Sequence, residues 1–148
     1  MFVYGTLRPG QTNYGLVRSA VIARTLARLD NHSLRADACA SYPYAVEDRG
    51  HSVVGDLLEL KPGTEEAVLR RLDALEGYRP DATDPEKSHY LRVRRTVTTT
   101  SGDDDRGAAG PVIEAWVYLA GPAVSPGQQP LVPSGDWTVR RASLPGRL

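Results

Sequence analysis

Stretches rich in apolar residues recur along this chain between clusters of Pro, Gly and Asp, and this pattern limits the fold more than any other feature. The stretches are Phe2–Tyr4, Ala20–Leu29, Ser41–Val46, Ser52–Leu60, Tyr90–Thr99 and Val112–Leu119. Several alternate in polarity. In residues 91–94, for example, Leu and Val fall on one face of an extended chain and two Arg on the other. Such stretches, divided by turn residues, predict the strands of a mostly antiparallel sheet or barrel.

One segment has the period of a helix. Val68, Leu72 and Leu75 follow an i, i+4, i+7 spacing, which places them on one helical face. A Pro-Gly-Thr start signal precedes this stripe and Gly77 stops it. We therefore expect an α-helix over Thr64–Leu75 that buries the three apolar side chains. Many strands and one helix favour an α+β fold, either a small β-barrel or an open sheet with the helix packed on it.

The composition is that of an ordinary globular protein. The 148 residues fit a single domain, residues 1–148, with enough chain for a buried core. Eighteen basic and eighteen acidic residues cancel, so no net field attracts nucleic acid or an anionic membrane. Cys39 is the one cysteine, which excludes an internal disulfide and a thiolate zinc cage and favours a reducing, cytoplasmic setting. No signal peptide or membrane-spanning apolar run is evident.

The signatures of metal, nucleotide and covalent chemistry are missing from the sequence. His32, His51 and His89 lack the spacing of metal ligands, and no GxSxG motif surrounds a serine. No Walker loop or GxGxxG motif is present, so nucleotide binding is unsupported. The motifs therefore imply neither a metal nor a cofactor.

Three segments are expected to be irregular. Arg79–Ser88 carries two prolines and several charges between the helix and the next strand. Ser101–Gly110 has the composition of a hairpin tip. The tail from Gly121 is rich in Pro and Gly and is expected to wrap around the domain.

The loop that follows the opening strand is the first candidate site. A glycine directly after a buried strand, here Gly5, lets the backbone turn sharply and leaves successive amide groups unpaired. Such amides converge on an anion, most naturally a carboxylate or a phosphate. On these residues alone, a plain turn between a strand and a loop is the favoured alternative.

The second candidate is Glu76, in the last turn of the helix. The C-terminal end of a helix carries partial negative charge, and burial there would raise the pKa of the carboxyl toward the range useful for general acid-base work. An exposed glutamate is the alternative. Asp73, about one turn earlier, either shares the site or is a solvated partner of Arg70. Tyr90 and Tyr118 either line a pocket with their hydroxyls or are amphipathic core residues.

Together these elements resemble the gamma-glutamylcyclotransferase-like family, which includes gamma-glutamylamine cyclotransferases. The resemblance rests on an ordered series: Phe2-Val3-Tyr4-Gly5-Thr6-Leu7-Arg8, Tyr42-Pro43, Val54-Gly55-Asp56-Leu57, Leu72-Asp73-Ala74-Leu75-Glu76-Gly77-Tyr78, Tyr90-Leu91-Arg92, Ala115-Trp116-Val117-Tyr118 and Ser134-Gly135-Asp136-Trp137. It implies a small mixed β-barrel with flanking helices. Glu76 matches the family's catalytic glutamate. The family's substrate-binding positions match Tyr4, Gly5, Thr6, Leu7, Tyr90 and Tyr118.

The resemblance also implies a reaction. In a gamma-glutamyl amide the α-amine attacks the γ-carbonyl within the same molecule, which releases 5-oxoproline and a free amine or amino acid. Positioning supplies much of the rate, so neither a nucleophilic side chain nor a cofactor is required. Two features depart from the family: Asp56 stands where relatives commonly have Glu, and the Arg79–Ser88 loop is longer than in compact relatives. This loop borders the expected site and bears on substrate preference.

Two other functions stay open at this stage. One is a non-catalytic β-barrel module that binds a carboxylate metabolite through the Gly5 loop. The other, a nucleic-acid-binding barrel, is weakened by the zero net charge and the single Phe. The partner of the enzyme would be a small gamma-glutamyl compound, whose acceptor is a lysine side chain, a dipeptide or a protected biosynthetic intermediate. Residue patterns leave the oligomeric state undetermined.

Overall fold

The computed structural model of the chain describes residues 1–36, 42–78, 88–101, 108–124 and 129–139. Its strands are β1 (Phe2–Val3), β2 (Val21–Arg35), β3 (Tyr44–Leu60), β4 (Tyr90–Ser101) and β5 (Ala108–Ala120), and its α-helix is α1 (Glu65–Glu76). Short 3-10 turns cover Tyr14–Leu16, Arg18–Ala20 and Trp137–Val139. No helix in the described part of the chain is long and apolar enough to cross a membrane.

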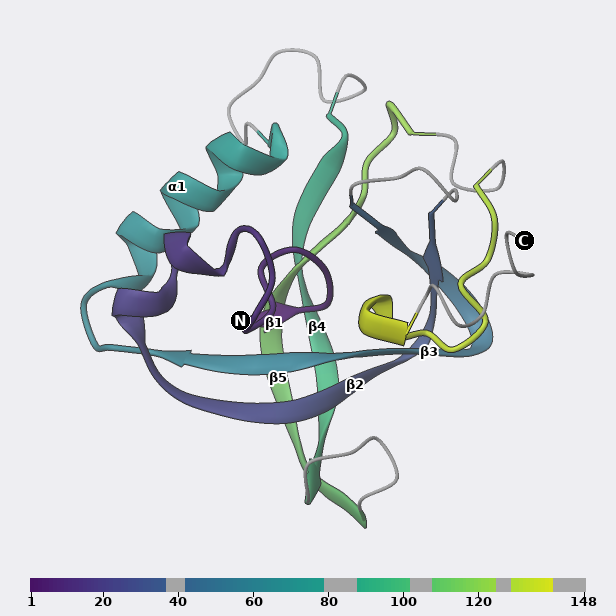
Figure 1. The fold of residues 1–148 in the computed structure, drawn as a ribbon, viewed down its shortest axis with the longest axis horizontal. Coiled ribbons are helices and arrows are strands. Elements are labelled where there is room, and N and C mark those ends of the chain that lie inside the picture. The colour runs from purple at the N-terminus through teal and green to yellow at the C-terminus, as the bar shows by residue number, and fades with distance from the viewer. Residues whose placement is uncertain (37–41, 79–87, 102–107, 125–128, 140–148) are drawn as a thin grey trace.

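The strands form one sheet in the order β1-β3-β2-β4-β5, and each neighbouring pair is antiparallel. Two long hairpins make up most of it. β2 pairs with β3 along nearly its whole length, and β4 pairs with β5 from Tyr90↔Ala120 to Ser101↔Ala108. Between the hairpins, the ladder of the described residues comprises Ala27↔Thr99 and Arg28↔Thr98. The β4–β5 hairpin therefore runs across the β2–β3 hairpin (Figure 1).

The prediction of an α+β fold, with a mostly antiparallel sheet and one α-helix, is confirmed. The closed, mixed barrel is not. Among the described residues no ladder joins the two edge strands, β1 and β5, and every pairing is antiparallel. A physical reason lies in β1, which has only two residues and so offers too few backbone groups to close a sheet.

The expected strands at Ser41–Val46 and Ser52–Leu60 belong to a single strand, β3. Its register against β2 shifts between Asp30↔Ser52 and His32↔Glu47, so β3 carries extra residues at that point. Gly50 lies in this bulge with a φ of 88°, a conformation that glycine adopts without strain. A bulged strand therefore reads in the sequence as two strands with a turn between them.

The strand β1 separates two apolar clusters. Phe2 packs into one cluster with side chains of β2 to β5, and Val3, on the opposite face, packs into the other beneath α1. The strand β1, which packs on both of its faces, also lies very close to β3. A Cβ at Gly55 would lie 2.3 Å from the Val3 carbonyl oxygen and 2.7 Å from the Phe2 ring, so only glycine fits there. The strand that carries the candidate loop is therefore held from both sides.

The α-helix is confirmed, but the prediction that Leu75 is buried is wrong. Val68 and Leu72 are buried, whereas Leu75 is 43% exposed. The buried face consists of Val68, Leu69, Leu72 and Asp73. Asp73 lies at the opposite edge of the buried face from Leu75, and its carboxylate is accommodated there by an ion pair with Arg92 on β4. Leu75 instead lies along the rim of a groove at the end of the helix.

In its described part the segment after Gly121 is irregular, as expected, apart from the 3-10 turn at Trp137–Val139. Its backbone is tied to the sheet at separate points. Val132 N–H donates to Leu34 O (2.8 Å), and Val54 N–H donates to Gly135 O (2.8 Å). The hairpin at residues 101–110 is confirmed by the pairing of its flanks, and its tip at 102–107 lies outside the described residues.

Candidate functional site

The Tyr4 side chain fixes the point at which β1 turns into the candidate loop. Its hydroxyl donates to the Tyr118 carbonyl oxygen and accepts a hydrogen bond from the Ala45 N–H (3.3 Å). These contacts join the turn to β5 and β3. Burial raises the pKa of Tyr4 far above its usual value, so the hydroxyl stays protonated and keeps its donor. Tyr4 therefore contributes a rigid wall rather than a mobile hydroxyl.

The backbone amides of Gly5, Thr6 and Leu7 donate no hydrogen bond to any described residue. The carbonyl oxygens of the turn are engaged instead. Arg8 N–H donates to Gly5 O (3.1 Å), and Asn13 N–H donates to Thr6 O (2.8 Å). A turn held by its carbonyls leaves its amides free for an external acceptor. The described residues therefore leave these three amides without an acceptor, which an anion site at this turn requires.

One pocket collects Glu76 and the six substrate-binding positions that the resemblance implied, but not Asp73. It contains about 370 Å³ of empty space, part of it open to solvent. Its lining comprises Phe2, Val3, Tyr4, Gly5, Thr6, Leu7, Tyr42, Pro43, Glu76, Tyr90 and Tyr118. The N-terminal loop and the helix end, some seventy residues apart in sequence, thus face the same cavity.

Glu76 closes α1 at the edge of this pocket. Gly77 follows it in the left-handed conformation with a φ of 68°, and its N–H donates to the Asp73 carbonyl oxygen, which ends the helix. Burial raises the pKa of the Glu76 carboxyl from its usual 4.5 to about 7. The prediction of a raised pKa at this helix end is confirmed. Near neutral pH this carboxyl is therefore able both to accept and to donate a proton.

Tyr90 and Tyr118 are both buried and line the pocket, so each sequence alternative for them holds in part. The Tyr90 hydroxyl donates to the Pro43 carbonyl oxygen (2.8 Å), and the Tyr118 hydroxyl donates to Asp73 Oδ1 (2.7 Å). Burial raises the pKa of both hydroxyls. Because their protons are already committed, these hydroxyls have only acceptor lone pairs left for a ligand.

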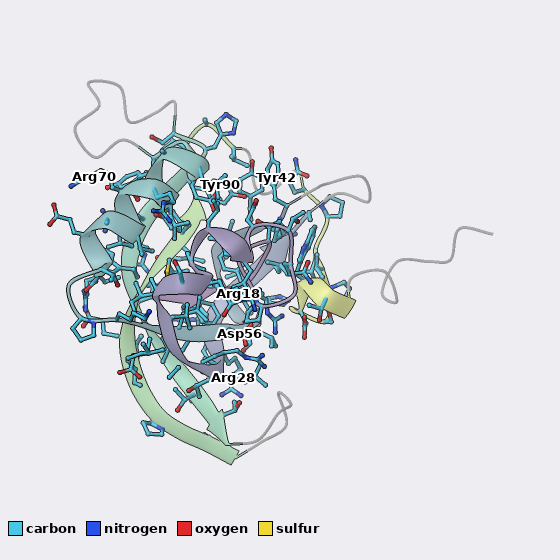
Figure 2. The ribbon with its side chains drawn as sticks, turned by 60° about the vertical axis from the view of Figure 1, so that its left-hand side comes forward. Arg18, Arg28, Tyr42, Asp56, Arg70 and Tyr90 are labelled. Atoms are coloured by element: carbon cyan, nitrogen blue, oxygen red, sulfur yellow. The ribbon has the colours of Figure 1, made fainter. Side chains whose placement is uncertain are left out.

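The expectation that Asp73 pairs with Arg70 or is solvated is wrong. Its carboxylate is buried and accepts from Arg92 Nε (2.8 Å) and Nη2 (3.1 Å) as well as from Tyr118. Arg70 pairs with Glu66 on the exposed side of the helix (Figure 2). Asp73 does not line the pocket itself, but it holds the hydroxyl of Tyr118, which does.

Sequence reasoning missed the aromatic cluster at the mouth of the pocket. Tyr44 and Tyr90 stack with ring centroids 4.7 Å apart, and Tyr42 meets Tyr44 edge-on at 5.8 Å. Figure 2 shows Tyr42 beside Tyr90, and their rings are 6.4 Å apart. The available signal was the run Tyr42-Pro43-Tyr44, with two tyrosines directly before and at the start of a strand.

A second, wider groove continues from the pocket and contains about 1010 Å³ of empty space. The residues common to both are Thr6, Tyr42, Glu76 and Tyr90. The groove is further lined by Thr12, Asn13, Tyr44, Leu75, Gly77 and His89. The loop expected at Arg79–Ser88 to border the site lies outside the described residues, apart from Ser88.

Arg8 anchors the candidate loop from its far side. The side chain is buried, its Nε donates to Asp56 Oδ2 (2.7 Å) and its Nη1 donates to Asp136 Oδ1 (2.9 Å). Arg24 Nε lies 3.0 Å from the other oxygen of Asp56. Asp56 thus forms ion pairs with two arginines, although its Oδ1 has no hydrogen-bond partner among the described residues.

Comparison with known proteins bears on the family and the fold of the chain. A family model described as "Gamma-glutamyl cyclotransferase, AIG2-like" matches residues 1–139. Two solved structures share the fold with a TM-score of 0.59 each. The uncharacterized protein PH0828 from Pyrococcus horikoshii is 20% identical, with 96% of this chain and 92% of that chain covered. YkqA from Bacillus subtilis is 23% identical, with 97% and 41% covered.

A third solved structure, At5g39720.1 from Arabidopsis thaliana, has a TM-score of 0.54 and is 20% identical, with 85% of this chain and 70% of that chain covered. At these identities the structures are informative about the fold alone. A comparison with curated proteins gives no match.

Proposed function

The chain belongs to the AIG2-like gamma-glutamyl cyclotransferase family, and we propose that it cyclises a gamma-glutamyl amide to 5-oxoproline and a free amine. The observation that carries this proposal is the position of Glu76. A carboxyl with a pKa of about 7 shares one pocket with three backbone amides that have no described acceptor. A proton-transfer group and an anion site on the same cavity are what this reaction needs.

In the proposed complex the α-carboxylate of the glutamyl group binds the free amides of Gly5, Thr6 and Leu7. The γ-carbonyl then lies toward Glu76, with the chain of the glutamyl group curled between the two. Tyr4 and Tyr118 wall the pocket, which favours the curled form over the extended one. Holding the α-amine against the γ-carbonyl supplies much of the rate, because the attack occurs within one molecule.

The proton movements follow from the titration of Glu76. As a carboxylate it takes a proton from the α-ammonium, and the freed amine attacks the γ-carbonyl carbon to form the ring C–N bond. As a carboxylic acid it then gives the proton to the departing nitrogen while the original amide C–N bond breaks. The regenerated carboxylate takes the second proton from the ring nitrogen and passes it to the released amine, which leaves as an ammonium ion. One carboxyl serves both steps because its pKa of about 7 makes both forms accessible at neutral pH.

The test is release of 5-oxoproline from gamma-glutamyl compounds by the wild type and by Glu76→Gln. Glutamine keeps the size of the side chain but transfers no proton, so turnover should fall by roughly a hundred-fold or more. Binding of substrate, measured by calorimetry, should change little because the loop amides are intact. If the two proteins cyclise at the same rate, Glu76 is not the base.

The same experiment separates the enzyme from a binding module. A module that only holds a carboxylate metabolite would bind gamma-glutamyl compounds and release no 5-oxoproline from any of them. Gly5→Ala serves as a matched test of the anion site. A Cβ there would lie 2.9 Å from Pro43 Cδ and displace the turn, so this variant should lose substrate affinity whichever function is correct.

A further inference from the structure

The groove that continues from the pocket is the place for the amine half of the substrate. Thr6, Tyr42, Glu76 and Tyr90 lie on both cavities, so the pocket opens into the groove beside the Glu76 carboxyl. Given the proposed function, the departing nitrogen has to lie at that carboxyl to receive its proton. Whatever substituent this nitrogen carries then extends into the groove.

Three tyrosine rings and Leu75 form the aromatic and apolar part of the groove lining, and Thr6, Thr12, Asn13, Glu76 and His89 form its polar part. Tyr42 is 49% exposed and Leu75 is 43% exposed, although they come from different elements, the segment before β3 and the last turn of α1. Large apolar side chains that gather on one concave surface, rather than lying singly, indicate a binding surface. The stacked pair Tyr44 and Tyr90 stiffens the wall, because each ring restricts the other.

The charges of the groove point to the same kind of ligand. Among the described residues that line it, none is Arg or Lys, and Glu76 is the one carboxyl. Burial raises the pKa of the Tyr44 hydroxyl to about 12, so this wall is neutral at physiological pH. A carboxylate on the amine half would meet Glu76 without a described cation to offset it.

We infer that the groove selects gamma-glutamyl amides whose amine half is an aromatic or apolar body without a carboxylate. This inference rests on the proposed cyclotransferase function and adds the substrate class to it. It distinguishes among the possible acceptors: an arylalkyl amine fits the groove better than a small polar amine or an amino acid. The selection arises because the apolar surface of the amine half is buried against Tyr42 and Leu75. It is therefore measured as a difference in kcat/KM between substrates.

Three substrates with the same glutamyl half test the inference. They are the gamma-glutamyl amides of benzylamine, of ethanolamine and of phenylalanine, each followed by 5-oxoproline release. We expect kcat/KM for the benzylamide to exceed that for the ethanolamide by about ten-fold or more. The phenylalanine amide keeps the ring and adds a carboxylate, so it should also react more slowly than the benzylamide.

Two variants at one position identify the surface responsible. Tyr42→Ala should reduce the ratio of kcat/KM between benzylamide and ethanolamide toward one, whereas Tyr42→Phe keeps the ring and should preserve it. Leu75→Ala, at an exposed helix position, should lower the ratio without unfolding the protein. Ile22→Ala is the control: it removes an equally exposed apolar side chain away from both cavities and should leave the ratio unchanged.

The possible outcomes distinguish a failure of this inference from a failure of the proposed cyclotransferase function. Equal kcat/KM for the three amides, or a ratio that Tyr42→Ala leaves intact, overturns the inference and leaves the cyclotransferase standing. A phenylalanine amide that reacts as fast as the benzylamide overturns the exclusion of the carboxylate. If none of the three releases 5-oxoproline while all three bind, the proposed function and this inference fall together.

Discussion

Glu76 is a carboxyl in a doubly unfavourable position. It lies in the last turn of α1, where the helix carries partial negative charge, and it is partly buried beside aromatic side chains. Both effects disfavour the ionised form, and burial alone is enough to raise its pKa from 4.5 to about 7. A position that costs stability at neutral pH is common for a group that has to move protons.

Because Glu76 is destabilised when ionised, the stability of the protein should depend on pH. The pKa of Glu76 is higher in the folded protein than in the unfolded chain, so proton binding favours folding. The contribution is fully present below pH about 4.5 and is lost as the pH rises through about 7, up to about 3 kcal/mol. Glu76→Gln carries no such titration. The free energy of unfolding of Glu76→Gln should therefore increase relative to that of the wild type between pH 5 and pH 8.

Urea unfolding of both proteins at several pH values measures this difference. Because all other groups are shared, their titration cancels in the comparison. A gap that stays constant from pH 5 to pH 8 would show that Glu76 ionises normally, and the acid-base role would lose its basis.

At the scale of elements, Asp73 ties the helix to the sheet. Its backbone carbonyl oxygen accepts from the N–H groups of Gly77 and Tyr78, which shapes the turn that follows Glu76. Its carboxylate accepts from Arg92 on β4 and Tyr118 on β5. One residue therefore ends the helix and sets the position of that end over the β4–β5 hairpin, next to the pocket.

Asp73→Asn tests this link between the elements. The change removes the charge that compensates the largely buried Arg92 guanidinium, so unfolding should become easier by roughly 3 kcal/mol. Glu66→Gln on the same helix breaks only the exposed pair with Arg70 and should cost less than about 0.5 kcal/mol. Chemical denaturation measures both. Equal, small losses would mean that Asp73 is an ordinary solvated helix residue.

At the scale of the whole molecule, Arg8 joins three distant parts of the chain. The guanidinium contacts Asp56 on β3 and Asp136 in the C-terminal segment, and the Arg8 backbone closes the turn at Gly5. The sheet itself stays open and its two hairpins share only two residue pairings. An ion cluster of this kind therefore carries part of the cohesion that a closed barrel would obtain from its ladders.

Arg8→Met keeps much of the side-chain volume and removes the charge. Asp56 is only 2% exposed and would keep a single partner, Arg24, so the loss of stability should be about 3 kcal/mol or more. KM for a gamma-glutamyl substrate should rise as well, because the loop loses its anchor. Arg28→Met removes an exposed arginine that pairs with Asp30 and should cost less than about 1 kcal/mol. An Arg8→Met variant as stable as this control would contradict the role of the cluster.

Local sequence signals predicted the helix and most of the strands, whereas the candidate site residues also depended on the family resemblance. The period of Val68 and Leu72 identified the helix, and alternation identified the strands, because both patterns record which side of one element is apolar. The end of the helix at Gly77 is likewise set by the conformational freedom of a single residue. These are properties of neighbours in the chain.

What only the tertiary structure decided depends on residues distant in the sequence. Asp73 is buried and Leu75 exposed because Arg92, nineteen residues later, lies under one and the groove under the other. The position of Tyr42 at the site depends on its ring contacts with Tyr44 and Tyr90. The sheet remained open because β1 is too short to pair at both edges. Periodicity specifies which face of an element is buried, whereas the partner of that face is a long-range contact that no local pattern records.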